Sequence, residues 1–182
     1  MALFHALAHI ELNAIDLAWD LIARFACKKL PKEFFDDWVR VGGEEARHFL
    51  LLNQLLLDHD ASYGCLAAHG GLWQAAIVTK DNLAARLAVV PMVLEARGLD
   101  VTPKIVNKLF HVGHKKAAQC LNEILSEEID HVAIGEHWFR WVSKDQETKP
   151  EVSWAQILAD YFPGKLKPPF NIEARKRAGM AA

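Results

Sequence analysis

Four glutamates stand inside the apolar stripes of this sequence, and they limit its possible folds more than any other feature. Apolar residues recur at three- and four-residue steps, the period of an amphipathic helix, in four successive long segments. Each of these stripes contains one glutamate in line with its apolar residues: Glu11, Glu45, Glu95 and Glu128. Carboxylates are almost never fully buried without a partner. A fold that buries the four stripes therefore has to provide partners for these side chains in its core.

The same periodicity predicts an all-α chain, since strand-like alternation is hard to find in the sequence. The expected helices have the following limits: 1–30, 32–60, 72–78, 82–97, 103–112, 114–144 and 154–162. Pro91 is expected to kink the helix at 82–97, and Gly98 with Thr102-Pro103 is expected to separate it from the next. Two hairpins joined by a long crossover are typical of an antiparallel four-helix bundle. We therefore expect a bundle over residues 1–144, with a C-terminal helix and tail over residues 145–182 packed on it.

Two Glu-x-x-His motifs lie on the second and fourth long helices, at Glu45-Ala-Arg-His48 and Glu128-Ile-Asp-His131. Residues three apart on a helix project from the same face, so a carboxylate and an imidazole spaced in this way can reach one metal ion. A buried Glu–His pair can also be a satisfied polar network that binds no metal. One motif alone does not separate the two interpretations.

The spacing of the four glutamates favours the metal. Glu11 and Glu45 are 34 residues apart and Glu95 and Glu128 are 33 apart, so each half of the sequence pairs a lone glutamate with a Glu-x-x-His helix. Each midpoint falls near a predicted turn, which places the two carboxylates of a hairpin at about the same level. Four carboxylates and two imidazoles at mid-bundle are typical of a dinuclear carboxylate site. Four negative charges balance two divalent ions, and oxygen and nitrogen ligands suit iron or manganese.

These residues carry a resemblance to a known superfamily. The pattern resembles the ferritin-like di-iron carboxylate proteins. More narrowly, His9-Ile-Glu11, Glu-Glu-Ala-Arg-His at 44–48, Leu-Glu-Ala-Arg-Gly-Leu-Asp-Val-Thr-Pro at 94–103 and Pro-Phe-Asn-Ile-Glu-Ala-Arg at 169–175 resemble a bacterial group known as domain of unknown function 455. Similar members often carry a segment ahead of the first helix. The resemblance implies a ferritin-like bundle with these metal ligands: Glu11, Glu45, His48, Glu95, Glu128 and His131.

Three functions use such a centre. The first is an oxidoreductase or hydroxylase in which two iron ions, manganese or a mixed iron/manganese pair activate dioxygen; Glu11, Glu45, Glu95 and Glu128 then form its catalytic set. It requires an unidentified organic substrate and an external electron donor. The second is a ferroxidase that binds or stores iron, and the third is a non-catalytic metal-binding protein. The pattern is also similar to bacterioferritin, but Ala46 stands where that family has a haem-ligating methionine.

Charge and composition limit the partners. Lys and Arg total 21 against 23 Asp and Glu, and this net charge of −2 argues against a nucleic-acid partner. The start of the sequence has no secretory pattern, and no apolar run is long enough to span a bilayer. Three cysteines without a Cys-x-x-Cys pair form no disulfide framework. We expect a cytoplasmic protein without a membrane partner, and the sequence leaves open whether it forms a homodimer.

Overall fold

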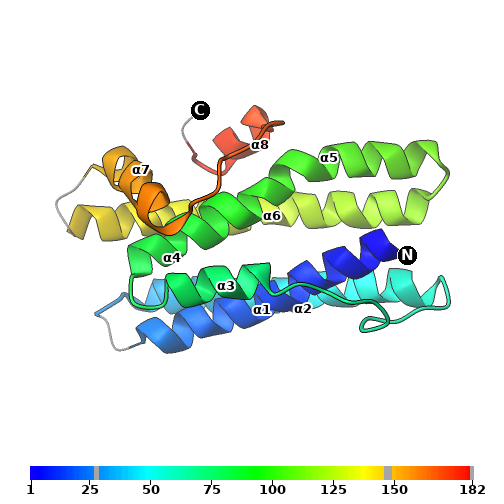
Figure 1. Ribbon diagram of the computed structural model, residues 1–182, viewed down its shortest axis with the longest axis horizontal. Helices are drawn as coiled ribbons and strands as arrows, with labels where there is room; N and C mark the ends of the chain where they lie inside the picture. The colour runs from blue at the N-terminus through cyan, green and yellow to red at the C-terminus, as the bar shows by residue number, and fades with distance from the viewer. Residues whose placement is uncertain (27–28, 146–148, 181–182) are drawn as a thin grey trace. The chain divides into compact units, whose positions relative to one another are not determined.

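The computed structural model describes residues 1–26, 29–145 and 149–180, and no strand occurs in this part of the chain. The prediction of an all-α fold is therefore confirmed. The chain divides into two compact units, residues 1–74 and 75–182, whose helices can be followed by colour in Figure 1. The boundary expected between a bundle and a tail at residue 144 stays a prediction. None of the described helices combines the length and the apolar composition of a membrane span.

The first unit is built on an antiparallel hairpin of α1 (Ala2–Phe25) and α2 (Lys32–Leu57), shown in blue to cyan in Figure 1. Small residues on the buried stripe of α1, such as Ala18, allow the two backbones to approach. Gly42 on α2 marks a tight contact, because a Cβ there would lie 3.2 Å from the indole nitrogen of Trp19. The hairpin agrees with the predicted helices, although α1 ends five residues and α2 three residues before the expected limits.

The segment that follows α2 is fastened to α1 by two histidines. The buried His5 ring accepts hydrogen bonds through Nε2 from the backbone N–H groups of Gly64 (3.0 Å) and Leu66 (3.3 Å). One turn along α1, His9 Nδ1 lies 2.8 Å from the hydroxyl of Tyr63. These contacts give the two histidines a structural role that no sequence motif had indicated.

The second unit contains one long, composite helix where the sequence predicted two. It runs through α4 (Leu83–Val89), the π-helix η1 (Val90–Glu95) and α5 (Ala96–His111), and α6 (Lys115–Asp145) packs against all three. The short helix α3 (Gly71–Val78) precedes α4. Gly113 connects α5 to α6 with a φ of +87°, a conformation that favours glycine. The expected break at Gly98 and Thr102-Pro103 is therefore wrong.

A side chain from the C-terminal segment explains why Pro103 does not end the helix. Proline has no N–H group, so the carbonyl of Leu99, four residues earlier, loses its helical partner. The side-chain amide of Asn171 donates a hydrogen bond to that carbonyl at 3.1 Å. The Oδ1 atom of Asn171 also accepts from the Ala174 N–H and caps α8 (Ile172–Arg177). Asn171 thus supplies the hydrogen bond that the Leu99 carbonyl loses at Pro103, and it also caps the N-terminus of α8.

A buried ion pair holds the same C-terminal segment on α5. Arg175 donates from Nε and Nη2 to the two carboxylate oxygens of Asp100, at 2.8 and 2.7 Å. The Asp100 side chain is fully buried, and it also accepts from the Asn171 backbone N–H at 2.9 Å. Two-point contact between a guanidinium and a carboxylate adds geometric specificity to the charge attraction. The C-terminal segment is therefore a fixed part of the second unit.

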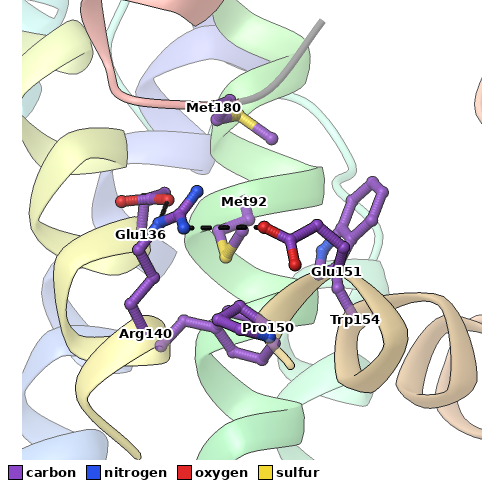
Figure 2. Close-up of a pocket in the computed structure, with 8 residues that line it drawn as sticks. Met92, Glu136, Arg140, Pro150, Glu151, Trp154 and Met180 are labelled. Atoms are coloured by element: carbon purple, nitrogen blue, oxygen red, sulfur yellow. Dashed lines mark hydrogen bonds and ion pairs between the residues drawn. The ribbon is translucent and has the colours of Figure 1, made fainter. Parts of the chain in front are cut away.

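Helix α7 (Pro150–Tyr161) packs on α4 and α6. Arg140 of α6 pairs with Glu136 on its own helix, and its Nη1 lies 3.6 Å from Glu151 Oε1 on α7. Figure 2 shows Arg140 between the two carboxylates, at the edge of a cavity of about 280 Å³ that Met92 and Trp154 help to line. The three charges are therefore already paired with one another.

The closest approach in the second unit is between η1 and α6. A Cβ built on Gly135 would lie 2.4 Å from Cβ of Pro91, a separation that real Cβ atoms do not reach. Because the two helices are antiparallel, the contact also sets their register: Glu95, four residues after Pro91, lies at about the level of His131, four residues before Gly135. The contact between Gly135 and Pro91 thus sets the level of Glu95, a predicted metal ligand, along α6.

We expect Gly135→Ala to lower the free energy of unfolding by about 1–3 kcal/mol, because the rigid Pro91 ring has to move. The matched control is Gly98→Ala on α5, where nothing lies within 4 Å of the new Cβ. That change should raise stability by about 0.5–1 kcal/mol, since alanine favours a helix. Urea unfolding followed by circular dichroism measures both. Equal effects from the two substitutions would contradict the close contact.

Candidate metal centre

Three of the predicted ligands lie together in the first unit. Glu11 on α1 is 7% exposed, and Glu45 and His48 on α2 are fully buried. Nδ1 of His48 lies 3.6 Å from Oε2 of Glu11 and 3.4 Å from Oε2 of Glu45. The Glu-x-x-His spacing puts Glu45 and His48 on one face of α2, and the antiparallel hairpin brings Glu11 to the same level. The structure therefore brings these three side chains together within the first unit.

The second unit repeats the arrangement on α6. Nδ1 of His131 lies 3.4 Å from Oε1 of Glu128, the same separation as in the Glu45–His48 pair. The His131 side chain is fully buried and that of Glu128 is 12% exposed. Glu95 is the last residue of the π-helix on the neighbouring segment; it is half-buried, and its Oε2 atom is inaccessible to solvent. We call Glu11, Glu45 and His48 the first half-site, and Glu95, Glu128 and His131 the second half-site.

The separations between His48 and its two glutamates, and between His131 and Glu128, suit metal ligands. Two donor atoms bound to one ion at about 2.0–2.2 Å lie about 3.0–3.5 Å apart in tetrahedral or octahedral geometry. The separations of 3.4 to 3.6 Å are close to these values. They are longer than a good hydrogen bond from nitrogen to oxygen, which is about 2.7–3.2 Å. Each of the two Glu–His pairs, Glu45–His48 and Glu128–His131, thus has donor atoms and burial that suit a metal ion.

Charge is compatible with a metal in the first half-site. Glu11 and Glu45 carry −2, and a divalent cation beside a neutral imidazole would balance this charge. Buried charges in proteins are paired or bind metals, because an ion that leaves water loses its hydration. Oxygen and nitrogen donors without sulfur favour iron or manganese over thiolate-bound zinc.

The sequence did not indicate the π-helix that ends at Glu95. A π-turn inserts one extra residue into a helix and changes the direction in which later side chains project, and such turns occur frequently at functional sites. Here the π-helix coincides with Pro91 and with the contact to Gly135. Pro91 within an apolar helix is the available signal in the sequence, but such a proline predicts only a kink.

Comparison with known proteins supports the narrower of the two resemblances. A relative from Haemophilus influenzae (strain ATCC 51907 / DSM 11121 / KW20 / Rd), described as "Uncharacterized protein", is 40% identical over 184 residues. The alignment covers 98% of this chain and 64% of the relative, so the chain spans a little under two thirds of that protein. No solved structure matches the chain. A family model matches residues 1–182, and the chain belongs to that family, "Protein of unknown function (DUF455)".

Proposed function

We propose that the two half-sites together form one dinuclear metal centre inside a ferritin-like bundle, and that the protein is an oxygen-dependent oxidoreductase. The metals are two iron ions, or manganese in one or both positions. The ligands are Glu11, Glu45, His48, Glu95, Glu128 and His131. The observation that carries the proposal is the repeated Glu–His pair, with a separation of 3.4 Å and a fully buried imidazole in each unit.

The combined charge of the two half-sites supports two ions. Four carboxylates carry −4, which two divalent cations neutralise while both imidazoles stay neutral. A single divalent cation would leave a net charge of −2 on these six side chains, so the balance favours two ions over one.

Iron bound at these residues would supply electrons for the reduction of dioxygen. The contribution of the chain is to bind and orient the metals. His48 and His131 would each give one nitrogen donor, and the glutamates would give oxygen donors whose negative charge favours the more oxidised metal. Burial of Glu45, His48 and His131 keeps bulk water away from these donors. The proposal also requires an organic substrate that is oxidised and an external electron donor.

We expect chelated protein, titrated anaerobically with Fe(II) or Mn(II), to bind two ions per chain. Glu45→Ala should weaken binding of both ions, by more than about 100-fold, because loss of a ligand costs more than the 10–100-fold typical of an outer-shell change. Glu128→Ala should have the same effect from the other unit. Asp130→Ala is the matched control, since Asp130 lies within the same motif but is exposed.

Separate half-sites would give a different titration. If each unit held its own ion independently, Glu45→Ala would remove one ion and leave the second with unchanged affinity. That result would contradict a shared centre. Binding of both ions by the Glu45→Ala and Glu128→Ala variants with wild-type affinity would reject the ligand assignment altogether.

We expect Fe(II)-loaded protein to consume dioxygen in one stoichiometric burst at about two irons per chain, and then to need an external reductant. Oxygen-electrode traces, with iron counted after gel filtration, measure this. Glu45→Ala should abolish the burst and Asp130→Ala should preserve it. Continued uptake of many irons per chain would favour iron storage, whereas two bound irons without oxygen consumption would favour a non-catalytic metal-binding protein.

A further inference from the structure

Two sequence segments that carry the family resemblance are not explained by the metal centre. The centre uses only Glu95 from residues 94–103, and nothing from residues 169–175. In the second unit, side chains of both segments line one pocket of about 340 Å³, together with residues 162–167. Small-molecule sites in proteins usually measure about 300–1,000 Å³. The pocket therefore has the size of a ligand site.

The pocket is strongly cationic. Arg97, Lys165, Lys167 and Arg175 line it, and Asp100 is the acidic residue among its lining side chains. The buried Asp100 carboxylate accepts two hydrogen bonds from Arg175, and Arg97 Nη1 also lies 3.7 Å from its Oδ2 atom. Four cationic side chains against this one carboxylate leave a net charge of +3 at the pocket, on a chain whose overall charge is −2. A local potential of this sign raises the local concentration of anions.

Arg97 holds the lysine-bearing segment beside α5. Its Nη1 donates to the carbonyl oxygens of Lys167, at 2.7 Å, and Pro169, at 3.0 Å. Both carbonyls belong to the segment that connects α7 to α8, so the backbone beside Lys165 and Lys167 is fixed. The ammonium groups of these lysines stay available to a ligand, since both residues are exposed.

The rest of the lining is apolar. Val93 and Leu94 contribute from the π-helix, and Phe162, Leu166 and Phe170 from the C-terminal segment. Leu166 is 39% exposed and Phe170 is 41% exposed, which is high for large apolar side chains. The Arg175 guanidinium lies 5.3 Å from the centre of the Phe170 ring, so charged and apolar surfaces meet there.

We propose that this pocket binds a small organic anion: a carboxylate or phosphate head held by Lys165 and Lys167, with an apolar body against Leu166 and Phe170. The cavity beside Arg140 is a weaker candidate, because its charges already pair with one another. The site lies within the second unit and needs no metal. Its existence is therefore independent of the proposed oxygen chemistry.

The test is isothermal titration of the full chain with four probes: hexanoate, hexyl phosphate, inorganic phosphate and hexylammonium. We expect one hexanoate or hexyl phosphate per chain, weaker binding of inorganic phosphate, and no binding of hexylammonium. Affinity should fall as salt increases, since salt screens an exposed charged site. The stronger of the two amphipathic anions identifies whether the natural head group is a carboxylate or a phosphate.

Paired variants locate the site. Lys165→Ala combined with Lys167→Ala should weaken the amphipathic anions by about 10-fold or more, because two charged donors are lost. The control combines Lys104→Ala with Lys108→Ala, which removes the same charge from exposed positions on α5 outside the pocket. Leu166→Ser should reduce hexyl phosphate binding while leaving inorganic phosphate unchanged.

Three results would overturn the proposal. The first is failure of both amphipathic anions to bind the wild-type chain. The second is an equal loss of affinity in the two double-lysine variants, which would show that net charge and not this pocket attracts the anions. The third is hexylammonium binding as tightly as hexanoate. Thermal melts of each variant confirm that these exposed substitutions leave the fold intact.

Discussion

Burial of carboxylates on apolar helix faces is the constraint on which the rest of the structure depends. Removing a charged group from water costs several kcal/mol unless another charge or a metal compensates. In the first half-site, Glu45 is fully buried and Glu11 nearly so, beside the single imidazole of His48. A helical hairpin meets this constraint only in a register that brings the charged residues to one level. The small residues of α1 let α1 and α2 approach closely in this register. In the second unit, the contact between Gly135 and Pro91 sets the register of η1 against α6.

Helical period and motif spacing were enough to predict the two hairpins and the internal geometry of the first half-site, because residues three apart on a helix share a face whatever surrounds them. The continuity of α4, η1 and α5 could not be predicted in this way. Pro103 normally ends a helix, and it is tolerated here because Asn171, 68 residues later, satisfies the Leu99 carbonyl. The π-helix at Pro91 depends equally on a partner far away in the sequence, Gly135 of α6. The pattern of neighbouring residues in a sequence does not reveal contacts with residues so far away along the chain.

The C-terminal segment has a larger role than its composition suggested. Proline and lysine residues near the end of a sequence are typical of a solvated tail. Here Arg175 pairs with the buried Asp100, Asn171 completes α5, and Arg97 holds the backbone at Lys167. The segment is thus fixed on the second unit, along the composite helix that carries Glu95.

The central claim is that one centre with two metals uses ligands from both units. X-ray absorption at the iron edge of the iron-loaded chain tests it most directly, because it reports donor types and neighbouring metals without crystals. The account predicts oxygen and nitrogen donors only, about one histidine per iron, and a second metal at about 3.5–4 Å. Manganese-loaded protein should give the same pattern at its own edge. A single isolated ion without a metal neighbour, or sulfur among the donors, would contradict the claim.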